Sequence, residues 1–150
     1  MVESLIHMDK AVFRFFNTTI ANPFFDWIMP IITNQNIWAV PIIIIIFSLL
    51  FKGGRRGRIA VAIIIISVGL ADAASAQILK PFFARLRPSH ELTEGIRILV
   101  GKGGQYGFVS SHAANVFAAA VVFGYFYPRH KSTYFIIAAL VAFSRVYVGV

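Results

Sequence analysis

The sequence of 150 residues contains no cysteine and few charged side chains. The lack of cysteine excludes disulfide bonds and thiolate metal ligands. Charged residues make up 13% of the chain and hydrophobic residues 58%, whereas a soluble domain has roughly 25% charged residues. This composition excludes an ordinary soluble domain and predicts a protein embedded in a membrane.

Acidic residues are especially scarce, since 6 Asp and Glu stand against 14 Lys and Arg, for a net charge of +8. Such an excess of positive charge suits nucleic acid, anionic lipid or a phosphate-bearing substrate. Nucleic acid is the poorest match for so apolar a chain. We therefore expect a lipid bilayer as a partner, anionic lipid or a phosphate-bearing substrate as a ligand, and no nucleic acid, and we leave the oligomeric state open.

Long apolar runs predict one all-α transmembrane domain over residues 1–150, built as a bundle of about five spanning or interfacial helices. Residues 1–20 mix apolar and charged side chains and predict an amphipathic helix at the membrane interface. Residues 22–36 hold two prolines and are interpreted as the upper part of a first, broken span. The remaining expected spans are residues 34–51, residues 59–79, residues 113–127 and a helix that starts at Thr133.

Two short basic loops predict the orientation, because such loops usually stay in the cytoplasm. They are residues 52–58, KGGRRGR, and residues 128–131, PRHK. Alternation of the spans then places the long polar loop, residues 80–111, on the outer side. His112 and Arg145 are expected on that same side.

Three cations and two prolines gather in the segment KPFFARLRP, which begins at Lys80. Basic side chains at helix ends often extend to the membrane–water interface without any further role, and this interpretation is sufficient for Lys80 taken alone. It explains less well a set that also contains Arg85 and Arg87. Pro81 and Pro88 restrict the backbone around them, and lysine and arginine together offer the point charge and the planar fork that bind phosphate.

Two serines and a histidine stand where the next span begins, at Ser110, Ser111 and His112. A helix N-terminus presents free N–H groups and a partial positive charge, which attract anions. Either serine is a suitable N-cap, and the alternative interpretation is an ordinary cap beside an interfacial histidine. His112 is placed to donate a proton to a leaving oxygen.

Arg145 ends a later apolar run on the same expected face and adds a further cation. Together these segments predict a site for a tetrahedral oxyanion. No carboxylate pair or histidine cluster lies near them in the sequence, so we expect neither a metal nor another cofactor. Phosphoryl transfer depends on positioning and charge stabilisation, which arginine and lysine supply.

These residues resemble the signature of the type 2 phosphatidic acid phosphatase superfamily, membrane lipid phosphatases that share a fold with vanadium haloperoxidases. Residues 80–88 match the first motif, K-x6-R-P, in full. The second motif, P-S-G-H, reads VSSH at residues 109–112, so that its serine and histidine stand and its proline and glycine are replaced. Ser144, Arg145 and the spacer VYVGV match the start of the third motif, S-R-x5-H-x3-D.

The resemblance implies a role for each matched residue. The phosphate would be bound by Lys80, Arg87, Ser110 and Arg145, with help from the backbone N–H of Ser111. His112 would be the general acid that protonates the leaving group.

The family's nucleophile is the histidine of the third motif, which forms a phosphohistidine that water then hydrolyses. An aspartate four residues later orients it, as in other pairs of base and orienting group. The histidine would directly follow Val150, and both residues are absent from the chain. We therefore expect a truncated member of a family with six spans that is inactive by itself.

The family further implies metal-independent hydrolysis in a bacterial-type inner membrane, by a multi-pass protein whose site faces the periplasm or the cell exterior. The candidate substrates are undecaprenyl pyrophosphate, phosphatidylglycerol phosphate, phosphatidic acid and the lipid A phosphates. The alternative is a non-catalytic membrane protein that only binds anionic lipid. Vanadate-dependent peroxidase chemistry uses similar motifs, but the predicted spans disfavour it.

Overall fold

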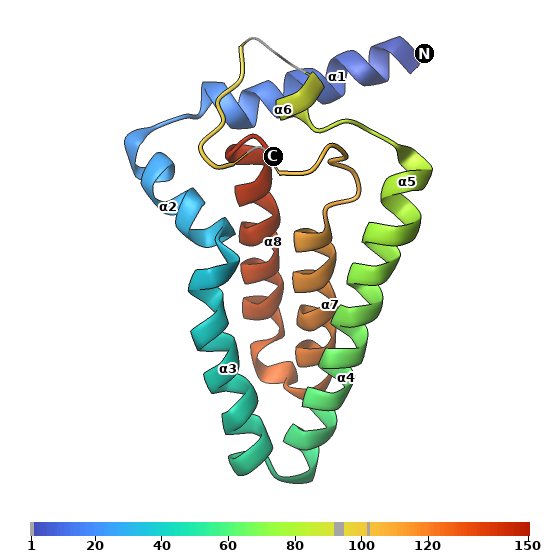
Figure 1. Ribbon diagram of the computed structural model, residues 1–150. Coiled ribbons are helices and arrows are strands. Elements are labelled where there is room, and N and C mark those ends of the chain that lie inside the picture. Colours follow the sequence, from blue (N-terminus) through green and yellow to red (C-terminus); the bar gives the residue numbers. More distant parts are fainter. Residues whose placement is uncertain (1, 92–94, 102) are drawn as a thin grey trace.

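The computed structural model describes residues 2–91, 95–101 and 103–150, and within them it is helical without any strand (Figure 1). The predicted all-α class is thereby confirmed. The α-helices are α1 (Val2–Arg14), α2 (Pro23–Thr33), α3 (Gln35–Lys52), α4 (Gly54–Ala73), α5 (Lys80–Phe83), α6 (Pro88–Glu91), α7 (Ser111–Phe126) and α8 (Lys131–Tyr147). Two π-helical segments, Phe15–Thr19 and Ala74–Leu79, and one 3₁₀ turn, Pro128–His130, join them.

Two of the described helices are long and apolar enough to cross a membrane. They are α3, with 18 residues, and the continuous helix Gly54–Phe83, with 30 residues. No side chain of α3 is buried, although the helix is apolar along most of its length. Such a surface suits contact with lipid chains. The expected spans at residues 34–51 and 113–127 correspond to α3 and to the shorter α7.

The second long span does not end at Leu79, as the sequence predicted, but continues to Phe83. The expected end rested on Lys80, a basic residue at which the polar loop was expected to begin. In the structure Pro81 lies in the first turn of α5, directly after the wider π-helical turns of Ala74–Leu79. Lys80 therefore belongs to a helix rather than to a loop.

The helix α7 lies at the centre of the bundle and packs against both α4 and α8. Small side chains occupy these contacts, which lets the helices approach closely. A Cβ atom on Gly124 would lie 3.1 Å from Cγ of Lys131. The buried residues of the three helices are Gly57, Ala60, Val61, Ala120, Val122, Gly124, Ala138, Val141, Ser144 and Tyr147.

A tight turn joins α3 to α4 at the end of the molecule far from the chain termini (Figure 1). A Cβ atom on Gly53 or on Gly57 would lie 2.4 Å from the carbonyl oxygen of Leu49, so only glycine fits at either position. The guanidinium of Arg56 stacks 5.2 Å above the ring of Tyr127. The two basic turns, residues 52–58 and 128–131, are thus neighbours, which agrees with the prediction that both lie on the same side of the membrane.

The helix α1 lies across the opposite end of the bundle (Figure 1). Asp9 forms an ion pair with Arg85, and Nζ of Lys10 lies 2.7 Å from a carboxylate oxygen of Glu91. Both pairs are partly exposed, so each contributes little stability by itself. The pair with Asp9 nevertheless gives a structural explanation for Arg85, to which the family motif assigns no role. The interfacial position of residues 1–20 stays a prediction.

Candidate functional site

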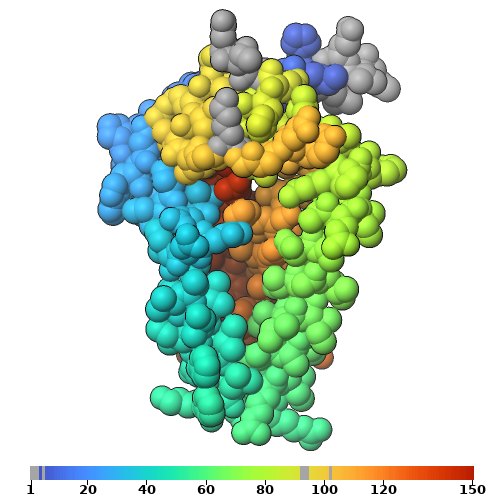
Figure 2. Space-filling model, in the orientation of Figure 1, coloured from blue at the N-terminus to red at the C-terminus, as the bar shows by residue number. Residues whose placement is uncertain are grey.

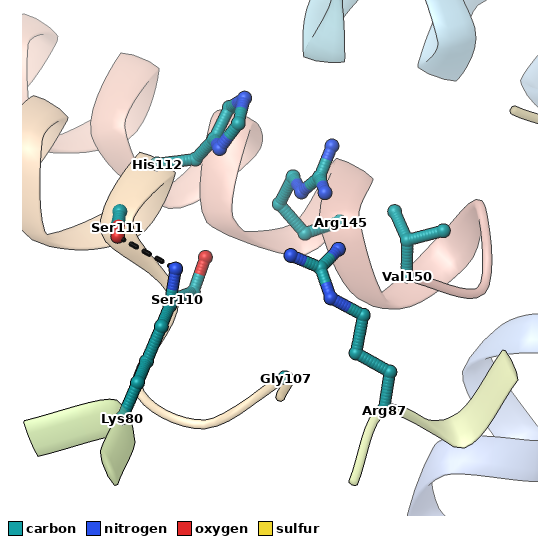
Figure 3. Close-up of a pocket in the computed structure, with 8 residues that line it drawn as sticks. All are labelled: Lys80, Arg87, Gly107, Ser110, Ser111, His112, Arg145 and Val150. Atoms are coloured by element: carbon teal, nitrogen blue, oxygen red, sulfur yellow. Dashed lines mark hydrogen bonds between the residues drawn. The ribbon is translucent and has the colours of Figure 1, made fainter. Parts of the chain in front are cut away.

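The three sequence motifs meet in one pocket beneath α1, at the end of the bundle where α5, α7 and α8 come together (Figure 3). The space in the pocket, including the part open to solvent, is about 240 Å³. All six residues predicted from the sequence line it. Among the described residues, the lining is Lys80, Arg87, Gly107, Ser110, Ser111, His112, Arg145 and Val150.

Lys80 and the start of α7 form one wall of the pocket. Nζ of Lys80 donates a hydrogen bond of 2.9 Å to Oγ of Ser111. Oγ of Ser110 accepts the N–H of Ala113 at 3.4 Å, so Ser110 is the N-cap and Ser111 the first residue of the helix. The backbone N–H of Ser111 is one of those that an α-helix leaves without an internal acceptor. The partial positive charge of the helix therefore falls at the pocket wall.

Arg87 is held in a slot of backbone. Its N–H donates to the carbonyl of Gln105 at 3.0 Å, and its Nε donates to the carbonyl of Tyr106 at 3.2 Å. A Cβ atom on Gly107 would lie 2.8 Å from Cγ of Arg87, so the slot needs glycine there. Burial lowers the pKa of the Arg87 guanidinium, because desolvation disfavours its charged form. Arginine nevertheless stays protonated in proteins.

Arg145 reaches the pocket from the last turn of α8. Its Nη1 donates to Oγ1 of Thr33 at 2.9 Å, which ties α8 to the end of α2. Ser144, its partner in the third motif, is fully buried and donates from Oγ to the carbonyl of Val141 at 2.7 Å. Ser144 therefore supports the helix, and Arg145 faces the pocket.

A buried polar network fixes the end of α8. The hydroxyl of Tyr147 donates to Oδ1 of Asp26 at 2.7 Å, and Asp26 also forms an ion pair with Arg97. Nδ2 of Asn17 donates to the carbonyls of Arg97 and Tyr147, each at 2.8 Å. Asn17 and Tyr147 are both 0% exposed. The network holds in place the turn that carries Arg145.

Gly149 completes this arrangement. Its φ is +84°, in the region that favours glycine, and a Cβ atom there would lie 2.3 Å from the carbonyl oxygen of Arg97. The N–H of Leu99 donates to the carbonyl of Val148 at 3.1 Å beside it. The spacer VYVGV of the third motif therefore packs closely against the segment around Arg97 and Leu99.

The charges of the pocket are all of one sign. Lys80, Arg87 and Arg145 converge there, and the guanidinium groups of Arg87 and Arg145 face each other (Figure 3). Among the described residues, no Asp or Glu side chain belongs to its lining. Like charges this close repel each other, so an oxyanion bound between them relieves the repulsion. In the part of the chain that the structure describes, no three His, Asp or Glu side chains form a group that could hold a metal ion.

His112 lies on the far side of the pocket from Lys80, beside Arg145 (Figure 3). Outside the pocket lining, Nδ2 of Asn115 donates to Oδ1 of Asp72 at 3.1 Å. This bond between α7 and α4 agrees with a structural role for Asp72. The roles of the six site residues in binding and catalysis stay predictions, because geometry alone places them without assigning a function.

The comparisons with known proteins agree with this geometry. The model of the PAP2 superfamily matches residues 57–150. A lipid A 4'-phosphatase of Porphyromonas gingivalis is 30% identical over 155 aligned positions, which cover 99% of this chain and 65% of that protein. A lipid A 4'-phosphatase of Bacteroides thetaiotaomicron is 32% identical over 157 positions, which cover 99% of this chain and 69% of that protein.

No solved structure matches the chain. The chain spans about two thirds of the length of these two relatives, 65% and 69%. The family match includes every one of the three motifs that line the pocket. On these grounds the chain belongs to the PAP2 superfamily, the type 2 phosphatidic acid phosphatases.

Proposed function

We propose that the protein removes phosphate from a membrane lipid phosphate, and that its substrate is a lipid A phosphate. The observation that carries the proposal is the convergence of Lys80, Arg87 and Arg145 on one pocket at the end of an apolar bundle (Figure 3). The names of the two relatives favour lipid A over undecaprenyl pyrophosphate, phosphatidylglycerol phosphate and phosphatidic acid.

The three cations and the N-terminus of α7 are suited to hold the non-bridging oxygens of the phosphoryl group. Charge stabilisation of this kind supplies much of the catalysis of phosphoryl transfer. His112 donates its proton to the oxygen of the departing alcohol while the bond from phosphorus to that oxygen breaks. No step in this scheme calls for a metal ion.

The nucleophile is the histidine that the family motif places directly after Val150. Val150 lines the pocket, so a residue joined to its carbonyl carbon starts at the pocket wall. Attack by that histidine forms a bond from nitrogen to phosphorus, and water then releases inorganic phosphate. The motif's aspartate orients the histidine during both steps.

This chemistry would take place at one surface of a bacterial inner membrane. The two basic turns lie at the opposite end from the pocket (Figure 1). Because basic loops favour the cytoplasm, the pocket faces the periplasm. A head group can then enter the pocket while its acyl chains stay in the bilayer.

Two measurements on detergent-purified protein test the proposal. The first is binding of inorganic phosphate to the 150-residue chain, with Arg87→Ala as the variant and Arg55→Ala, at the far turn, as the control. We expect binding by the wild type and the control, and a loss of binding in Arg87→Ala. Equal binding by all three proteins would contradict a phosphate site at this pocket.

The second measurement is release of inorganic phosphate from lipid A in the presence of a chelator. It uses a form of the protein that includes the histidine of the third motif. We expect faster release from lipid A than from phosphatidic acid or undecaprenyl pyrophosphate. Strict dependence on an added metal would refute the mechanism, and phosphate binding without turnover of any of the lipids would favour the non-catalytic alternative.

A further inference from the structure

A second, more open chamber adjoins the phosphate pocket. The space in it, including the part open to solvent, is about 750 Å³, against about 240 Å³ counted in the same way for the pocket. Figure 2 shows it as a hollow between α2–α3 and α7, with atoms of α8 visible at its back. Its polar lining is Thr33, Asn34, Gln35 and Asn36, together with His112 and Arg145, which also line the phosphate pocket.

We propose that this chamber binds the sugar ring that carries the phosphate, and so forms the subsite for the leaving group. The inference rests on the proposed function, in which His112 protonates the oxygen between phosphorus and the departing alcohol. That oxygen must lie beside His112, with the phosphate on one side and the alcohol on the other. His112 lines both the pocket and the chamber, and Lys80 and Arg87 line only the pocket, so the chamber is the place for the alcohol.

The chemistry of the lining suits a sugar better than a second phosphate. Four consecutive side chains, Thr33 to Asn36, carry hydroxyl or carboxamide groups and no charge. Such groups donate to and accept from the hydroxyls and the amide of an amino sugar. A diphosphate would call for further positive charge, and the described lining adds none to His112 and Arg145.

Of the four polar side chains in this segment, two form hydrogen bonds that stabilise the fold. Oδ1 of Asn34 accepts the N–H of Asn36 at 3.0 Å and so caps α3, and Thr33 accepts a bond from Arg145. Gln35 and Asn36 are exposed. Across the described residues, no hydrogen bond uses either of their carboxamides. These two groups are therefore free to bind a ligand.

The test compares three soluble probes that share a phosphate and differ in the alcohol. They are N-acetylglucosamine 4-phosphate, glycerol 3-phosphate and inorganic phosphate, and their binding to the detergent-purified 150-residue chain is measured by calorimetry. We expect the sugar phosphate to bind about tenfold more tightly than the other two, because two neutral hydrogen bonds are worth about that much. The double variant Gln35→Ala with Asn36→Ala is expected to remove this advantage and to keep the affinity for inorganic phosphate.

Gln77→Ala is the matched control, since this carboxamide is exposed and lines neither cavity. Equal affinity of the wild type for sugar phosphate and glycerol phosphate would overturn the inference and leave the phosphate site intact. Equal weakening of all three probes in the double variant would also overturn it. If a folded wild type bound none of the probes, the proposed phosphate site would fail first, and circular dichroism confirms that the fold is present.

Discussion

The phosphate pocket and the chamber beside it share two residues and differ in nearly everything else. The pocket is small, positively charged and walled in part by the backbone of Gly107 and the first turn of α7. The chamber is open, and its lining, as far as the structure describes it, carries no charged or titratable side chain apart from the shared His112 and Arg145. A charged group is recognised by fixed charges, whereas an alcohol is recognised by many weak and neutral bonds. Under the proposed function, the difference teaches how one site would separate the group that it transfers from the group that it releases.

The variant His112→Ala tests the boundary between the two regions and has the largest expected effect. Loss of a general acid should slow phosphate release by about 10²- to 10⁴-fold. It is measured as kcat for lipid A in a form of the protein that carries the third-motif histidine. Binding of inorganic phosphate should stay nearly unchanged. A parallel loss of binding would show that His112 holds phosphate rather than donating a proton.

The variants Arg87→Ala and Arg145→Ala compare the two regions, because Arg87 lines the pocket whereas Arg145 lines both the pocket and the chamber. Each should weaken binding of inorganic phosphate by about 10- to 100-fold, since a hydrogen bond to a charged group is worth more than a neutral one. Arg87→Ala should leave the ratio of sugar phosphate to phosphate affinity unchanged, because Arg87 lines only the pocket. Arg145→Ala should shrink that ratio, and identical ratios in the two variants would remove the distinction between the regions.

Gly149→Ala tests whether the pocket depends on its structural support. The added methyl group would lie 2.3 Å from the carbonyl oxygen of Arg97, and the positive φ is unfavourable for alanine. We expect a loss of about 1–3 kcal/mol in the free energy of unfolding, together with weaker phosphate binding. Gly69→Ala is the control, since a Cβ atom there meets nothing within 4 Å. A variant as stable as the wild type would show that the chain end adapts.

Thr33→Val should have the smallest effect. It removes the oxygen that accepts from Arg145 at 2.9 Å while keeping a similar side-chain volume. We expect phosphate affinity to fall by roughly two- to tenfold, the value of one hydrogen bond. Thr19→Val, on the segment Phe15–Thr19, is a comparison at a position that lines neither cavity. A loss as large as that of Arg145→Ala would mean that Thr33 positions Arg145 entirely.

The spacing within each motif is local, so Lys80, Arg87, Ser110 and Arg145 could be singled out from the sequence. The structure brings them together in one pocket, and their roles stay predictions. The choice of N-cap stayed open until the structure placed Ser110 Oγ against the N–H of Ala113. The end of the second span was predicted wrongly, since a π-helical segment before Pro81 has no simple sequence pattern.

The supports of the site could not be predicted from the sequence. Thr33 is separated from Arg145 by 112 positions, and Asn17 from Tyr147 by 130. No periodicity connects residues so far apart. The four polar residues after Ile32 were the available signal for the chamber, since such a run is unusual within an apolar segment. Their number exceeds what a helix cap requires.

The bond of Asn17 to the end of α8 also bears on how the protein is made. Asn17 is synthesised long before Tyr147, whose carbonyl oxygen it binds across 130 positions. The apolar helices between them can enter the membrane one after another as they leave the ribosome, whereas this bond must wait for α8. Insertion and maturation of the pocket are therefore separate events. The helices can thus lie in the membrane early, whereas the pocket takes its final form only when the Asn17 segment meets the end of α8.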